Sequence, residues 1–295
     1  MAPVRFRLVL ALALCLPMGA IAPAATAQDG AARLALIDGQ TVGGWVAVES
    51  SLVPDSMEGV SALLFTVPVD WKTGEPGYPI GWPRIQMSVL PGQGDWGGWE
   101  QLRLRIYALT DADPLPYRPV GVTISGEERG SSWERDVEGL RPGRWQEFAF
   151  DLSEVPALDR VRSVGIFISE DAYRDGERLR FYIAKLELVR YRRPTMVEMR
   201  PLASPAFADA RALPVEVTML GLPESGSAPV SLRLLRGGRV VARSEGSAER
   251  GATQLSLALP KGLAPGEYVL TASCEGGELT RGVTLVASPW EERAR

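Results

Sequence analysis

Tryptophan is the residue type whose distribution in this chain points most directly to chemistry. Seven of the eight tryptophans fall between Trp45 and Trp145. An indole offers a wide, flat apolar face on which the C–H face of a pyranose ring can stack, while nearby amides, carboxylates and guanidinium groups bond the sugar hydroxyls. This mixture of residues is typical of sugar-binding clefts, so stacking on a carbohydrate is the first hypothesis for this region.

The irregular stretch 70–83 holds the first candidates. Its glycines and prolines exclude a regular element, and a long loop with several aromatic rings is unusual unless those rings meet a partner. We predict that loop aromatics contact the ligand: Trp71, Tyr78, Trp82, Trp96 and Trp133. The predicted hydrogen-bonding partners of the ligand are Arg84, Gln86, Arg105 and Glu134.

Two other interpretations of the aromatic residues stay open. Trp45, Trp99 and Trp145 are flanked by strand patterns and could serve packing, and we expect Trp45 in the core. Trp133 is expected on the surface, within a charged segment. A protein ligand stacked on the same rings is the second functional interpretation.

The absence of histidine narrows the enzyme classes. It excludes Ser–His–Asp and Cys–His catalysis and every histidine-based zinc or iron site. Paired carboxylates, a Ser–Lys dyad or an all-carboxylate metal site would remain. The carboxylates weighed for a glycosidase are Glu127, Glu128, Glu170, Asp171 and Asp175. Because the run 169–177 is a charged turn between strands, we predict a solvated loop and no catalytic residue, and a carboxylate glycosidase is the third hypothesis.

No cofactor is predicted. Closely spaced oxygen ligands in 169–177 would suit calcium, but the D-x-D-x-D-G pattern is missing. The glycines of 94–98 precede a strand pattern, whereas a phosphate-binding loop must open a helix. The net charge of −4 comes from mixed acidic and basic residues, so no nucleic-acid partner is expected.

The first residues read as a targeting segment. Arg5 and Arg7 precede an apolar run, and Ala25-Thr26-Ala27 fits a cleavage site, so a signal peptide over 1–27 and a periplasmic or extracellular location are predicted. The apolar run is too short for a membrane span. With this segment removed Cys274 is the remaining cysteine; a buried small hydrophobe is favoured over a reactive thiol.

Three short runs between Gly143 and Tyr191 have the alternation of antiparallel strands packed face to face. The pattern G-R-W-Q-E-F-A-F-D-L-S, then V-x-S-V-G-I-F-I and F-Y-I-A-K-L-E-L, resembles the galactose-binding-like jelly rolls, which include many carbohydrate-binding modules. The stretch 94–106 resembles the same family. The resemblance implies a jelly-roll domain over 28–193 with a sugar ligand. Ala184 and Lys185 stand where such modules often carry aspartates that help to hold structural calcium.

A second module is predicted after a Pro/Ala-rich linker over 194–211. Six short strand patterns between 212 and 288 have the spacing of a small sandwich, followed by a tail over 289–295. The stretch 262–268 resembles the turn before a late strand of bacterial immunoglobulin-like domains, which implies a tyrosine corner at Tyr268. This module is expected to be a spacer or to dock a protein partner.

The sequence thus predicts an exported all-β protein with two sandwiches, a jelly roll followed by an immunoglobulin-like domain. Its predicted function is non-catalytic carbohydrate binding through the first. The alternative is a periplasmic structural or protein-interaction module with no sugar ligand.

Overall fold

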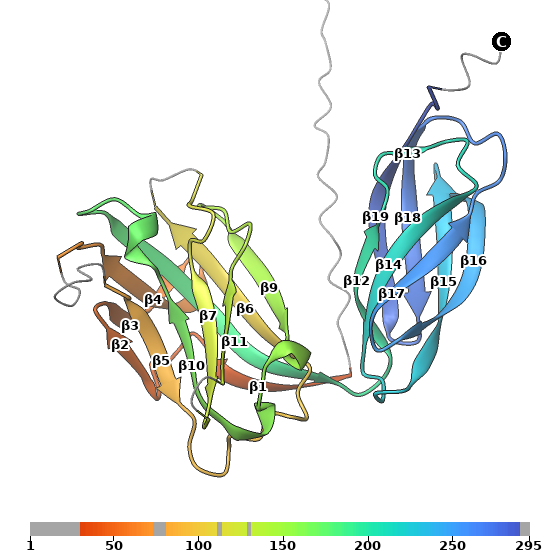
Figure 1. Ribbon diagram of the computed structural model, residues 1–295. Helices are drawn as coiled ribbons and strands as arrows, with labels where there is room; N and C mark the ends of the chain where they lie inside the picture. Colours follow the sequence, from red (N-terminus) through yellow and green to blue (C-terminus); the bar gives the residue numbers. More distant parts are fainter. Residues whose placement is uncertain (1–29, 73–80, 111–113, 129–130, 290–295) are drawn as a thin grey trace, which may run out of the picture.

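The computed structural model describes residues 30–72, 81–110, 114–128 and 131–289, and every regular element longer than a single turn there is a β-strand. The predicted all-β fold is therefore confirmed. The chain forms two sandwiches that meet at one end (Figure 1). The predicted signal peptide and Tyr78 lie outside the described residues.

The first sandwich packs two antiparallel sheets face to face. Sheet I has the order β3-β4-β11-β6-β9, with β1 also paired to β11, and sheet II has the order β2-β5-β10-β7-β8. The strands are β1 (Ala31–Ile37), β2 (Trp45–Val48), β3 (Ser51–Met57), β4 (Val60–Pro68), β5 (Arg84–Ser88), β6 (Gln101–Leu109), β7 (Gly121–Gly126), β8 (Ser132–Asp136), β9 (Trp145–Asp151), β10 (Val161–Phe167) and β11 (Arg178–Tyr191). Single 3-10 turns are η1 (Leu152–Glu154), η2 (Leu158–Arg160) and η3 (Glu170–Ala172).

Alternation along the strands decides which side chains form the core. In β6 Leu102, Leu104 and Ile106 are at most 1% exposed and face the other sheet. Arg103 and Arg105, between them, point to the outer surface. The same rule buries Val122 and Ile124 of β7 and Val164 and Ile166 of β10, so the residues between these lie on the outer face of sheet II.

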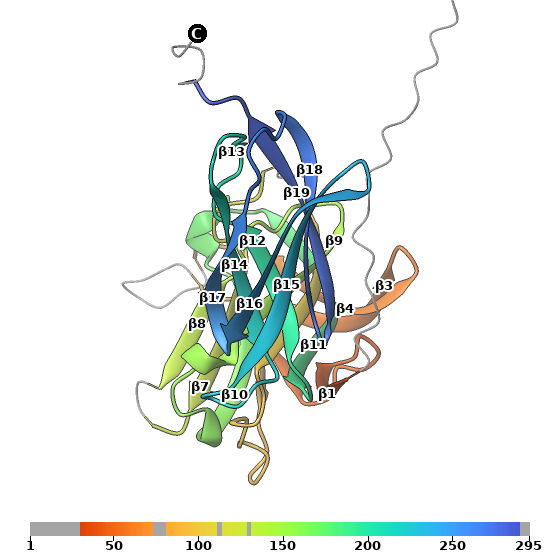
Figure 2. The ribbon, with the colours of Figure 1, turned by 90° about the vertical axis from the view of Figure 1, so that its right-hand side faces the viewer.

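The second sandwich packs sheet β12-β14-β17 against sheet β13-β19-β18-β15-β16, and Figure 2 views the molecule from its side. Its strands are β12 (Thr195–Pro201), β13 (Ala206–Phe207), β14 (Ala212–Leu220), β15 (Ser227–Arg236), β16 (Arg239–Glu249), β17 (Gly251–Ala258), β18 (Gly266–Cys274) and β19 (Gly277–Val286). The hydroxyl of Tyr268 donates to the carbonyl of Ala264 at 2.6 Å, which is the predicted corner.

Residues 194–211, predicted as a linker, contain strands of the second sandwich. The first part of this segment is β12, which pairs with β14, and its last part contains β13, which pairs with β19. Met196 and Met199 of β12 are buried in the core of the second sandwich. The prolines and alanines suggested a linker, but burying these two methionines provides the free energy that orders the segment.

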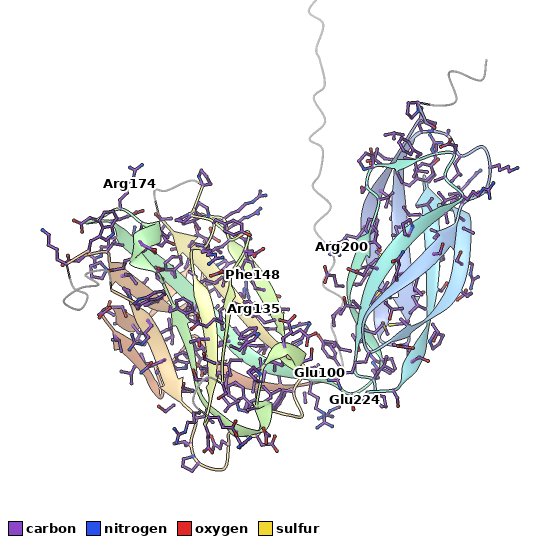
Figure 3. The ribbon with its side chains drawn as sticks, in the orientation of Figure 1. Glu100, Arg135, Phe148, Arg174, Arg200 and Glu224 are labelled. Carbon is purple, nitrogen blue, oxygen red and sulfur yellow. The ribbon has the colours of Figure 1, made fainter. Side chains whose placement is uncertain are left out.

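A buried carboxylate joins the two sandwiches. Glu100, 7% exposed, accepts hydrogen bonds from the backbone N–H of Tyr191 and of Gly221, both at 2.8 Å. Gly221 has φ +74°, and a Cβ there would lie 2.1 Å from the carbonyl oxygen of Arg193, so this position requires glycine. Figure 3 places Glu100 at the junction and Arg174 at the far end of the first sandwich.

Candidate functional site

The outer face of sheet II has small side chains along its centre. β7 contributes Gly121, Thr123 and Ser125, and β10 contributes Ser163 and Gly165. Register places Thr123 directly beside Gly165, and Ser125 beside Ser163. None of these side chains is larger than threonine, so the centre of this face carries short side chains only.

Longer polar side chains border this strip of short side chains on both sides. Arg84 and Gln86 of β5 pair with β10, while Glu134 and Asp136 of β8 pair with β7. Thus one row across the sheet reads Gln86, Gly165, Thr123 and Glu134. We call the strip and its borders the trough; its floor carries hydroxyls and its sides carry an amide, a guanidinium and carboxylates.

Aromatic rings occupy one end of the trough. The rings of Trp82 and Phe167 lie 6.0 Å apart between centroids at an angle of 49°. Phe167 lies over Gly121, where a Cβ would be 2.3 Å from the ring, so a glycine is needed for this ring position. Trp82 is 43% exposed and Tyr117 is 75% exposed. Together with Ser169 and Asp171 they line an open cavity of about 630 Å³.

Buried Glu170 fixes the segment that carries Trp82. Its carboxylate is 1% exposed and accepts from the backbone N–H of Asp70 at 3.1 Å and of Gly81 at 2.9 Å. The indole N–H of Trp71 donates to the carbonyl of Glu170 at 3.2 Å. The Glu170 side chain thereby binds the backbone at Asp70 and at Gly81. Because Trp82 is the next residue after Gly81, this contact also fixes its position.

Tyr173 fixes the other aromatic segment. Its buried hydroxyl donates to the carbonyl of Pro119 at 2.6 Å, two residues from Tyr117. Burial, and secondly the charge of Glu177, raise the pKa of Tyr173 well above its ordinary value. The phenol therefore keeps its proton and its hydrogen bond at neutral pH.

The polar groups of the trough differ in what they already bind. Arg118 pairs with Asp136, with 3.2 Å between Nε and Oδ2. Arg84 donates to the amide oxygen of Gln86 and to the carbonyl of Trp82, both at 3.2 Å. Among the interactions of the described residues, none involves the exposed carboxylate of Glu134, which leaves it free to accept from a ligand.

The structure brings four of the predicted site residues to one face. Trp82 and Glu134 line the cavity, and Arg84 and Gln86 of β5 lie at the border of the trough, where Arg84 bonds to the carbonyl of Trp82. Trp71, 41% exposed, lies close by through its bond to Glu170. Arg105 lies elsewhere, on the outer face of sheet I, with its guanidinium 5.2 Å from the ring of Trp145.

Two predicted loop aromatics are core residues, so their expected exposure is wrong. Trp96 is 2% exposed and its indole donates to the carbonyl of Gln93 at 3.1 Å. Trp133 is 5% exposed and packs edge-on against Phe150. Arg135, on the same side of β8, lies over the indole of Trp133 and shields it from water. Trp45 is buried, as predicted.

Sequence reasoning missed Tyr117, Phe167, Asp136 and the small residues of the floor. The alternation of Gly121, Thr123 and Ser125 with buried valine and isoleucine was a usable signal, since an outward face of only small residues leaves space. No pattern in the sequence marks Tyr117, because its place depends on the distant hydroxyl of Tyr173.

Three further features of the described part of the chain concern metal ligands, the cysteine and membrane-spanning helices. No group of three or more aspartate, glutamate or cysteine residues there could hold a metal ion. Cys274 is half-buried, with its sulfur 3.7 Å from the carbonyl of Pro194. In these same residues no helix has the length and apolar character needed to cross a membrane.

Comparison with known proteins gives glycoside hydrolases as structural neighbours. They include a β-1,2-glucanase from Parabacteroides distasonis (12% identity, TM-score 0.36, 88% of this chain and 39% of that chain). A β-glucuronidase of glycoside hydrolase family 2 has 11% identity and a TM-score of 0.36, with 88% and 30% covered. A family 2 member from Bacteroides cellulosilyticus DSM 14838 has 12% identity and a TM-score of 0.34, with 82% and 35% covered.

The chain spans less than two fifths of the length of each of these enzymes. TM-scores below 0.5 do not establish a common fold, so neither the fold nor a ligand of this chain rests on them. No protein-family model matches the sequence, and no curated protein matches it.

Proposed function

We propose that this protein is an exported, non-catalytic carbohydrate-binding protein and that its ligand lies in the trough of sheet II. The observation that carries the proposal is the combination of exposed rings at one end with small hydroxyl side chains along the strip and a free carboxylate, Glu134, at its border. A sugar ring presents apolar C–H faces and many hydroxyls, so it needs both kinds of surface at once. Export rests on the targeting pattern of residues 1–27.

The aromatic end supplies stacking and the borders supply orientation. Trp82 and Tyr117 expose ring area that Glu170 and Tyr173 hold in place, so little conformational entropy is lost on binding. Glu134 can accept from sugar hydroxyls, and the amide N–H groups of Gln86 can donate to them. These bonds replace those that the hydroxyls make with water.

Binding without catalysis is the simpler account of the carboxylates. A glycosidase needs a general acid whose carboxyl is shielded from water, opposite a second carboxylate. Glu134 and Asp171 are exposed to solvent, and Asp136 is occupied by Arg118. Buried Glu170 is occupied by two backbone N–H groups, which a general acid would have to release.

Affinity electrophoresis through gels that contain uncharged polysaccharides tests the proposal. We expect retardation by at least one of them, and Trp82→Ala should weaken binding about 30-fold because a buried stacking contact contributes about 2 kcal/mol. Arg105→Ala, on the other sheet, is the matched control and should bind like the native protein. Retardation by no polysaccharide would refute binding, and release of reducing ends during incubation would refute the non-catalytic role.

A protein partner is the second candidate, and the outer face of the second sandwich favours it. Val269 and Val240 are 41% and 51% exposed and both pair with Leu235, so they form an apolar row across β18, β15 and β16. Capture of one stoichiometric protein, insensitive to Trp82→Ala but lost on Val269→Glu, would favour this interaction module.

A further inference from the structure

Two positive charges beside the trough are already paired with carboxylates of the protein. Arg118 is paired with Asp136, and Arg135 with Glu154. Both guanidinium groups are therefore balanced by a carboxylate before any ligand arrives. A carboxylate or sulfate of a ligand would have to compete with these pairs.

Several carboxylates near the aromatic end lack such a cation. Among the described residues, Glu49, Glu134 and Asp171 take part in no ion pair. Glu49 accepts from the backbone N–H of Trp82 at 2.9 Å, and Asp171 accepts from the hydroxyl of Ser169. These neutral donors satisfy Glu49 and Asp171 without cancelling the negative charge of either carboxylate.

Arg84 alone does not offset these charges. Its guanidinium donates to two neutral oxygens, of Gln86 and of Trp82, and so keeps one positive charge. Against it stand the three carboxylates just described. Among the charged groups that line the cavity or bond to Trp82, unpaired carboxylates therefore outnumber unpaired cations, which favours a negative potential there.

We propose, resting on the carbohydrate-binding function above, that the trough selects uncharged glycans and rejects those that carry carboxylate or sulfate groups. An acidic sugar would meet like charges at short range on a partly desolvated surface, where repulsion is larger than in bulk water. An uncharged sugar gains hydrogen bonds to the same carboxylates, because ionised acceptors form stronger bonds with hydroxyls.

Pairs of derivatives, in which both members of a pair share one polysaccharide backbone, test this selectivity. Cellulose, starch and a galactan would each be offered as the hydroxyethyl derivative, which is uncharged, and as the carboxymethyl derivative of equal substitution. At about 0.01 M salt we expect the dissociation constant to be at least about tenfold higher for the carboxymethyl form, and the ratio to shrink at about 1 M salt.

Two variants test whether the named carboxylates cause the ratio of the two dissociation constants, that of the carboxymethyl form to that of the hydroxyethyl form. Glu134→Gln and, separately, Asp171→Asn should each narrow the ratio at least about threefold, since each removes one charge; thermal melting checks that both variants fold. Equal or tighter binding of the carboxymethyl form, or a ratio that neither variant changes, would overturn the selectivity while leaving carbohydrate binding intact. Binding of no derivative at all would instead overturn the proposed function, and this inference with it.

Discussion

The two outer faces of the first sandwich are built from the same kind of strand and differ in what they leave open. At the centre of sheet I, β6 and β11 place long side chains outward, among them Arg103, Tyr107 and Tyr182. At the centre of sheet II, β7 and β10 place hydroxyls and glycines outward. One face therefore fills its own surface, and the other leaves a trough.

On sheet I the outward side chains bind one another. Tyr107 packs edge-on against Trp145 at 5.6 Å and against Tyr182 at 6.3 Å between centroids, and both tyrosines are only 6% exposed. Glu187, 5% exposed, pairs with Arg33. Such contacts stabilise the fold, but they leave few ring faces or polar groups for a ligand. The difference shows that space and unsatisfied groups, rather than aromatic content, mark the candidate site.

Filling the trough is expected to have the largest effect. Thr123→Trp places a bulky ring on its floor, and we expect at least about 100-fold weaker binding, or ~2.7 kcal/mol, because the ligand can no longer reach the borders. Ala149→Trp makes a matched change on the exposed outer face of sheet I and should leave affinity unchanged. Isothermal titration calorimetry measures both, and thermal melting verifies folding. Equal losses in the two variants would break the comparison.

Two of the buried carboxylates, Glu170 beside the trough and Glu187 on sheet I, offer the next largest contrast. Glu170→Gln retains one acceptor oxygen for two N–H groups, so we expect a loss of stability of about 1–3 kcal/mol. Trp82 is then less well fixed, and affinity should fall by about 0.5–1.5 kcal/mol, roughly two- to twelvefold.

Glu187→Gln is the counterpart on sheet I. It should lower stability by about 1 kcal/mol by weakening the contact with Arg33, but leave affinity at the native value. Urea unfolding and calorimetry separate the two quantities. Affinity that falls as much in Glu187→Gln as in Glu170→Gln would show that stability, rather than the position of Trp82, controls binding.

The sequence predicts which side of a strand is buried much better than which strands become neighbours. The alternation that places Arg84 and Gln86 outward on β5 is local, so it could be predicted from the residues. The row from Gln86 to Glu134 needs the order β5-β10-β7-β8, which depends on long-range pairing.

Trp96 shows the same limit for loops. A glycine-rich segment suggested an exposed ring, yet the backbone N–H of Trp96 donates to the carbonyl of Leu158 at 2.8 Å and draws the ring into the core. A Cβ at Gly94 would lie 2.4 Å from the carbonyl oxygen of Val161, so this glycine is needed for close packing and does not mark a flexible loop. Only the folded partner strands reveal that role.

The smallest expected effects concern two buried tyrosines, Tyr173 near the trough and Tyr191 on sheet I. Burial raises the pKa of Tyr173, near the trough, and of Tyr191, on sheet I, where the charges of Arg103 and Arg33 partly oppose it. A folded-state pKa above the unfolded value of about 10 favours the protonated folded form. This contribution is complete below about pH 10 and is lost as pH rises above it, with a slope of up to about 1.4 kcal/mol per pH unit for each tyrosine.

Tyr173→Phe and Tyr191→Phe should each flatten this alkaline loss of stability, measured by urea unfolding between about pH 8 and pH 11. At neutral pH Tyr173→Phe should also cost about 1 kcal/mol of stability and weaken ligand binding severalfold, because the carbonyl of Pro119 loses its donor and Tyr117 its anchor. Tyr191→Phe removes the hydrogen bond that its hydroxyl donates to Gln101 and the one that it accepts from Arg103, but touches no part of the trough, so its affinity should stay native. If Tyr191→Phe weakened binding as much as Tyr173→Phe, the ligand would have to contact both faces or neither, and the contrast between the two sheets would lose its functional meaning.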